Sequence, residues 1–171
     1  MVASVCRSVV ASGRSLAVGC ASGADAAVLS AGLPVSSVRC FAAFGSSGRG
    51  AAGSASAVAA VQAFAAAGGA VSWWSGGGSP VPVAARLSAR TAAVVGAASV
   101  SVVVFFASPS SRGSVLAGRL AVGRGLPVFA FPIGFPGSAL PSLGAGSWVP
   151  VGGSGCWSSA WRFISSQATV F

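Results

Sequence analysis

Short apolar runs and runs of small, helix-forming residues alternate along this chain, with glycine or proline at the junctions. Runs such as Leu16–Val18 and Ser101–Phe106 predict strands, whereas Asp25–Ala31 and Val83–Ala97 predict helices. Strands that alternate with helices form parallel sheets with right-handed crossovers. The sequence therefore predicts an α/β fold built on a parallel sheet.

Serine and glycine mark the ends of the expected elements. Ser54 is suited to cap the helix that follows it, and Gly68 is suited to end that helix, because glycine readily takes left-handed backbone angles. The run Ser101–Phe106 is continuous in β-branched and aromatic residues, which is typical of a strand buried on both faces. We expect helices at residues 2–11, 25–31, 55–67, 83–97 and 114–122, and strands at residues 15–18, 35–44, 70–74, 101–106 and 128–131.

Charged residues are few, and all but one are arginines. Ten arginines stand against one aspartate, Asp25, and the formal net charge is +9. This balance favours anionic partners. The chain has no histidine, lysine, tyrosine or glutamate, so the usual general bases and the Ser-His-Asp, Cys-His and Ser-Lys arrangements are excluded. We therefore predict no catalytic residues and no enzyme activity.

The four cysteines do not form a metal motif. No two of them have the CxxC spacing, and no histidine is present to complete a zinc site. The cysteines are Cys6, Cys20, Cys40 and Cys156. The first three lie in or beside apolar runs, so we expect them to be small residues of the core. We expect no metal ion.

Two loops follow predicted strands and share one design. The string GCASGAD, Gly19–Asp25, follows the first strand, and ASPSSRGS, Ala107–Ser114, follows the strand at residues 101–106. In parallel sheets, ligands bind at the carboxyl ends of the strands, and glycine turns that open helices can hold phosphates. The carboxylate of Asp25 suits either a ribose hydroxyl or a helix cap, and both alternatives stay open.

The second loop adds hydroxyls and a positive charge. Ser110, Ser111 and Ser114 offer hydroxyl groups, Gly113 permits close backbone approach, and Arg112 supplies a fixed cation. The loop therefore suits a phosphate. The alternative is a serine-rich turn that only caps the following helix.

Three blocks of the chain together resemble a known family. They are GCASGADAAV (19–28), RLSARTAAVV (86–95) and VVVFFASPSSRGSVLAGRLAVGRGLPVFAFP (102–132). Their order and spacing are similar to those of the SLOG superfamily, the Rossmann-like group that contains DNA-processing protein A (DprA) and the LOG cytokinin-activating enzymes. The resemblance covers residues 15–132. It implies a Rossmann-like parallel sheet with helices on both faces, and a DprA-like domain.

The resemblance also implies a ligand pocket. Its predicted residues are Gly19, Ser22, Gly23 and Asp25 on one side, and Arg86, Arg90, Ser111, Gly113 and Ser114 on the other, with Arg112 added for its charge. In LOG enzymes a catalytic glutamate follows the second glycine turn, where this chain has Ala117. The resemblance therefore implies no phosphoribohydrolase activity. Family members also begin with one more strand, so we expect an N-terminally truncated domain.

The chain after Pro132 differs in composition from the rest. We expect a DprA-like domain over residues 1–132 and a Gly/Pro/Trp-rich tail over residues 133–171 that packs on the domain or extends it. Trp148, Trp157 and Trp161 either stack on nucleic-acid bases, aided by Arg162, or pack over an exposed sheet face.

These observations predict a cytoplasmic protein that binds a nucleotide or single-stranded nucleic acid through its phosphates. No cofactor is expected other than a bound nucleotide. Whether the protein forms a homo-oligomer stays open. The first alternative is a sensor of a nucleotide-derived small molecule. The second is a membrane protein, with Thr91–Ala107 as its best span, although a helix followed by a buried strand explains that stretch equally well.

Overall fold

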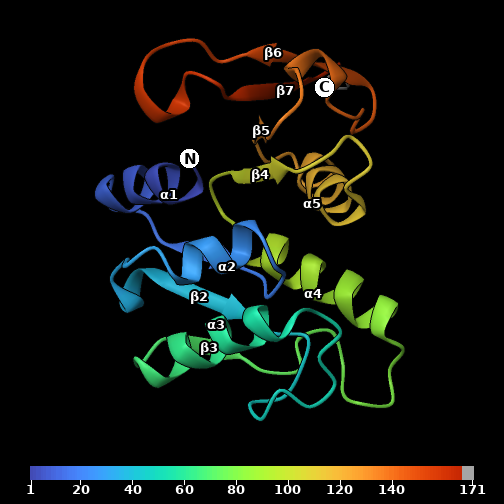
Figure 1. Ribbon diagram of the computed structural model, residues 1–171. Coiled ribbons are helices and arrows are strands. Elements are labelled where there is room, and N and C mark those ends of the chain that lie inside the picture. The colour runs from blue at the N-terminus through green and yellow to red at the C-terminus, as the bar shows by residue number, and fades with distance from the viewer. Residues whose placement is uncertain (167–171) are drawn as a thin grey trace. The chain divides into compact units, whose positions relative to one another are not determined.

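The computed structural model describes residues 1–166, and its helices and strands alternate up to Pro132 as the sequence predicts (Figure 1). The α/β fold class is confirmed, with helices around parallel strands in a manner consistent with a Rossmann-like fold. The chain divides into two compact units, Met1–Ala97 and Ala98–Phe171. The functional division that we expect at residue 132 stays a prediction, and the last five residues of the expected tail lie outside the described residues.

The first unit is built on a parallel sheet in the order β1-β2-β3. Leu16 lies opposite Val38, and Arg39 lies opposite Ala70. Helix α2 packs against α1 and α3, while α4 packs against β1 and β2. The elements are α1 (Val2–Ala11), β1 (Leu16–Val18), α2 (Ala24–Leu29), β2 (Val38–Phe41), α3 (Ala55–Ala66), β3 (Ala70–Ser72) and α4 (Val83–Ala97).

The predicted ends of α3 are confirmed. The Oγ of Ser54 accepts a hydrogen bond from the Ala57 N–H at 3.3 Å, and Gly68 has a φ of +87°. The strand expected at residues 35–44 is shorter, because Val35–Ser37 form a 3-10 turn after Pro34 and β2 begins only at Val38. The strand expected at residues 70–74 ends at Ser72, since Trp74 leaves the extended region with a φ of +54°.

The second unit is a mixed sheet in the order β4-β5-β7-β6. Strands β4 and β5 are parallel, whereas β7 is antiparallel to both β5 and β6. The elements are β4 (Val102–Phe106), α5 (Arg112–Gly123), β5 (Val128–Pro132), β6 (Gly146–Pro150) and β7 (Trp161–Ser165), with 3-10 turns at Gly137–Ala139 and Gly155–Trp157.

Two expectations for the second unit need correction. Strand β4 is not buried on both faces: Val102, Val104 and Phe106 are buried, while the two residues between them are only half-buried. The expected parallel sheet needs a second correction, because the tail contributes strands β6 and β7. These strands make the sheet mixed, so an all-parallel arrangement holds only for the first unit and for the β4–β5 pair.

The tail tryptophans pack on the sheet of their own unit. The Trp148 ring lies 6.5 Å from that of Phe106 and 5.2 Å from that of Phe163, and the Trp157 ring lies 5.7 Å from that of Phe129. The packing alternative is therefore confirmed for Trp148 and Trp157. Aromatic pairs of this kind stabilise a fold beyond the area that they bury.

The stretch that suggested a membrane span is divided between two elements. Residues up to Ala97 belong to α4, and β4 begins at Val102. No helix within residues 1–166 is both long enough and apolar enough to cross a bilayer.

Cysteines occupy the core of the first unit, as the sequence predicts. Cys6, Cys20 and Cys40 are buried with Val18, Val61 and Phe64 in one cluster. Burial raises the pKa of the Cys6 thiol from 9.0 to about 11. Burial also raises the pKa of Cys40 to about 12, helped by the neighbouring Cys20 and Asp25 and opposed by Arg90. Both groups therefore stay protonated in the folded chain well into the alkaline range.

We predict that the protein loses stability as the pH rises above about 9. In the unfolded chain the thiols ionise near that pH, whereas the folded pKa values are higher, so the stabilisation is complete below the unfolded pKa and is lost as the pH climbs through the folded values. The chain has no lysine or tyrosine to obscure this effect. Urea denaturation across this pH range measures it. Cys40→Ala should flatten the dependence, and Cys156→Ala, outside the core, should not.

Candidate functional site

The carboxyl edge of the β1-β2-β3 sheet carries the candidate site of the first unit. Because the three strands are parallel, the loops that follow them leave at the same edge. The loop after β1 contains Gly19–Gly23, the loop after β2 contains Gly45–Gly53, and the loop after β3 contains Trp74–Ser79. Helix α4, which carries Arg86 and Arg90, packs against the strands β1 and β2.

Asp25 and Arg90 form an ion pair at this edge. The Nη1 atom of Arg90 lies 3.2 Å from Oδ2 of Asp25. The Arg90 side chain is 11% exposed and the Asp25 side chain is 24% exposed. The same oxygen accepts a hydrogen bond from the Ala21 N–H at 2.9 Å. A side chain at Gly19 would collide with both charged groups, so glycine is required there for the pair to form. The pair joins the loop after β1 to α4.

The helix-cap alternative for Asp25 is wrong. Gly23 occupies the N-cap position of α2 with a φ of +83°, and no side chain caps this helix. Asp25 lies in the first turn of α2, and its carboxylate binds the loop and Arg90 instead. Its second oxygen, Oδ1, accepts no hydrogen bond from residues 1–166, which leaves the ribose alternative open.

Arg86 is buried without a carboxylate. The residue is 3% exposed, and its Nη2 atom donates to the Gly50 carbonyl at 2.8 Å. Its guanidinium carbon lies 5.2 Å from the centre of the Trp74 ring. The Nε and Nη1 atoms are buried and have no hydrogen-bond partner among the described residues. An arginine that retains its charge in such surroundings is energetically costly unless an anion is near.

The predicted residues of the second loop lie in the second unit. Ser111 is the N-cap residue of α5, and its Oγ accepts a hydrogen bond from the Ser108 N–H at 3.2 Å. The Ser114 hydroxyl donates to the Phe105 carbonyl at 3.1 Å, so its proton is used within the unit. Arg112 and Gly113 are exposed, and no side chain would be obstructed at Gly113. Arg112 is therefore the group of this loop most open to a ligand.

Within the first unit, the structure brings only some of the predicted residues together. Gly19, Asp25 and Arg90 touch one another, whereas Ser22 and Gly23 are exposed and form no side-chain contact of this kind. Sequence reasoning missed Arg49 and Trp74, which line a hollow at the same edge, with the Trp74 ring beside the Arg86 guanidinium. The string GSSGRG marks a loop in the sequence, but nothing in it signals that an arginine and a tryptophan meet there.

Comparisons of the chain with protein-family models, with curated proteins and with solved structures give no match. The resemblance to the SLOG superfamily therefore stays a prediction. Within residues 1–166, no three side chains of the metal-binding types lie together in a way that could hold an ion. Function has to be argued from the site itself, since a Rossmann-like fold serves many activities.

We predict that Asp25→Ala destabilises the protein by about 2 kcal/mol, because the largely buried Arg90 would lose its carboxylate. Urea denaturation measures this loss. Asp25→Asn, which keeps an acceptor for the Ala21 N–H, should cost less. Ser22→Ala, in the same loop but exposed, is the control and should cost almost nothing. An Asp25→Ala variant as stable as the parent would show that the ion pair has no structural role.

Proposed function

We propose that this protein binds a nucleotide or single-stranded nucleic acid through its phosphate groups, without catalysis of its own. One observation carries the proposal. Three arginines, Arg49, Arg86 and Arg90, lie at the carboxyl edge of the first sheet, where Asp25 is the single carboxylate and is bound to Arg90. The edge therefore has an excess of positive charge at the position where parallel sheets bind ligands.

The chemistry of the surrounding loops supports a phosphate-bearing ligand. The loops are rich in glycine and serine, which offer backbone N–H groups and hydroxyls to phosphate oxygens, and guanidinium groups bind phosphate with charge-assisted hydrogen bonds. In the second unit, the serine-rich loop has its own exposed cation, Arg112, at the start of α5. The resemblance to DprA-like members of the SLOG superfamily points to the same ligand class.

The residue types of the chain argue against catalysis. Histidine, lysine, tyrosine and glutamate do not occur in the chain, and Asp25 is engaged with Arg90. No ordinary general base is left to act on a bound ligand. The proposal includes a cytoplasmic location, where nucleotides and single-stranded nucleic acids occur and where thiols such as those of Cys6 and Cys40 stay reduced.

A second candidate function is a sensor of a nucleotide-derived small molecule. A hollow of about 350 Å³ at the same edge favours it, because this volume is at the lower end of the range for small-ligand sites. A sensor would need only this hollow, whereas nucleic-acid binding would use arginines over a larger surface. The two candidates therefore differ in how binding depends on ligand length and on salt.

We predict that oligodeoxythymidylate binds more tightly as its length increases, and that its binding weakens steeply with salt, because each phosphate contact releases a counterion. Fluorescence anisotropy with labelled oligonucleotides measures both effects, and adenosine monophosphate is the short competitor. Saturable binding of the mononucleotide with weak dependence on salt and no gain with length would favour the sensor instead. Binding of neither probe would contradict the proposed function.

A further inference from the structure

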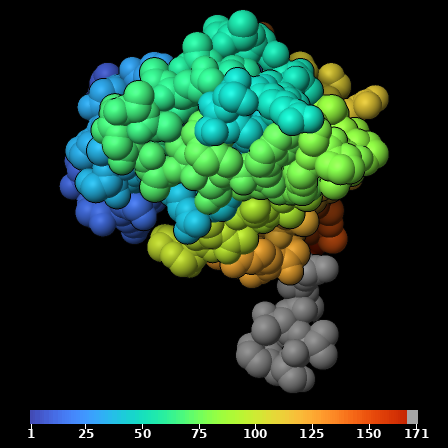
Figure 2. Space-filling view, turned by 90° about the horizontal axis from the view of Figure 1, so that it is seen from below, coloured from blue at the N-terminus to red at the C-terminus, as the bar shows by residue number. Residues whose placement is uncertain are grey.

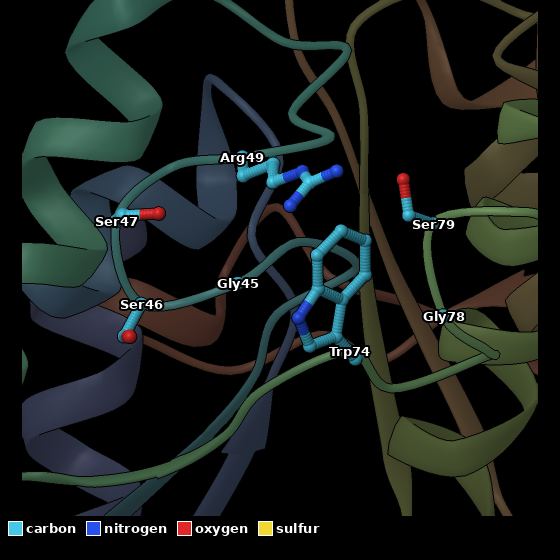
Figure 3. Close-up of a pocket in the computed structure, with 7 residues that line it drawn as sticks. All are labelled: Gly45, Ser46, Ser47, Arg49, Trp74, Gly78 and Ser79. Carbon is cyan, nitrogen blue, oxygen red and sulfur yellow. The ribbon is translucent and has the colours of Figure 1, made fainter.

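A hollow lies between the loops that follow β2 and β3 (Figure 3). Its volume is about 350 Å³, and it is open to solvent. Figure 2 shows these two segments, in cyan and green, meeting on one face of the molecule. The lining residues are Gly45, Ser46, Ser47, Arg49, Trp74, Gly78 and Ser79. None of them belongs to the pocket that the sequence predicts.

The hollow presents hydrogen-bond donors that the described part of the chain does not use. Arg49 is exposed, and its guanidinium has no hydrogen-bond or ion-pair partner among residues 1–166. Ser46 and Ser47 are exposed as well, and their backbone N–H groups and hydroxyls find no acceptor in that range. An arginine beside free backbone N–H groups and hydroxyls is suited to an oxyanion such as phosphate.

A second, buried guanidinium lies behind this lining. Arg86 donates to the Gly50 carbonyl at 2.8 Å, and its Nη1 atom would be 2.7 Å from a β-carbon at position 50. The loop can therefore come this close to the guanidinium only because residue 50 is glycine. With Nε and Nη1 unpartnered and no carboxylate beside it, Arg86 adds positive potential to the wall of the hollow.

Trp74 is held in an unusual conformation between the two loops. Among residues 1–166 it is the one non-glycine residue with a positive φ, at +54°. Its indole packs on Gly45 and Gly50, where side chains would collide with the ring, and on the guanidinium of Arg86. Strained backbone of this kind persists only where the surroundings hold it, and it is concentrated at binding sites.

We propose that this hollow is the subsite for one phosphate group of the ligand, with Arg49 as the direct contact and Arg86 as a positioning residue behind it. The inference rests on the proposed function and assigns that function to particular residues. The phosphate belongs to inorganic phosphate, a mononucleotide or a nucleic-acid backbone, and these sources share the chemistry that the hollow recognises.

Isothermal titration of the full chain with inorganic phosphate, adenosine monophosphate and oligodeoxythymidylate tests the inference. Arg49→Gln should weaken binding of the nucleotide and the oligonucleotide about tenfold, the effect of one lost charge-assisted hydrogen bond. The matched control is Arg14→Gln, which removes the same charge from an exposed residue before β1, at the opposite edge of the sheet. It should change the affinity less than twofold, as a rough upper limit for a distant surface charge.

Tryptophan fluorescence gives a second measurement that does not depend on the loss of a charge. Ligand binding should change the emission of the parent protein, and Trp74→Phe should remove that change. Trp73→Phe is its matched control, because Trp73 packs on the apolar core against Phe44. Inorganic phosphate lacks the rest of the ligand and should bind more weakly. If Arg49→Gln weakens this binding too, the hollow recognises the phosphate group itself, which supports the subsite.

The possible failures can be told apart. Equal effects of Arg49→Gln and Arg14→Gln, with the parent protein binding normally, would overturn the subsite and leave the proposed function standing. A parent protein that binds none of the three probes would overturn both. An emission change that survives in Trp74→Phe would also contradict the subsite.

Discussion

The ion pair between Asp25 and Arg90 is the contact on which the carboxyl edge of the first sheet depends. It is made by the one acidic side chain of the chain, and it joins the loop after β1 to α4. One turn earlier on α4, Arg86 reaches the Gly50 carbonyl and the Trp74 ring. A single carboxylate thus positions a helix whose two arginines organise all three loops at the carboxyl edge of the sheet.

The charge balance at this edge explains why an anion is expected there. Two guanidinium groups are largely buried, and only Arg90 has a carboxylate. Arg86 relies on one carbonyl oxygen and on the face of Trp74, which compensate part of the cost of burying a charge. Glycines at positions 19 and 50 leave room for the two buried guanidinium groups. A side chain at position 19 would displace Arg90, and one at position 50 would displace Arg86. A phosphate nearby would supply the missing negative charge.

The second unit relies on aromatic packing. Phe105 and Phe131 stack with ring centres 5.2 Å apart, and Trp148 contacts both Phe106 and Phe163. The contact between Trp148 and Phe106 joins the parallel pair β4–β5 to the antiparallel strands of the tail. The serine-rich loop before α5 satisfies most of its hydroxyls internally, which leaves Arg112 as its exposed charge.

The sequence by itself determined the order of helices and strands up to Pro132, the caps at Ser54 and Gly68, and the cysteine core, because these follow from local propensity and from hydrophobic patterning. It also singled out Asp25 and Arg90, yet it could not show that they bind each other. Strands β6 and β7 were not predicted, because glycine and proline interrupt the sequence around them and because β7 joins the sheet by pairing with β5, about 30 residues earlier. Only the tertiary structure decided which charges are buried and which loops meet at Trp74, since burial and contact depend on positions in space that residues distant in sequence take up together.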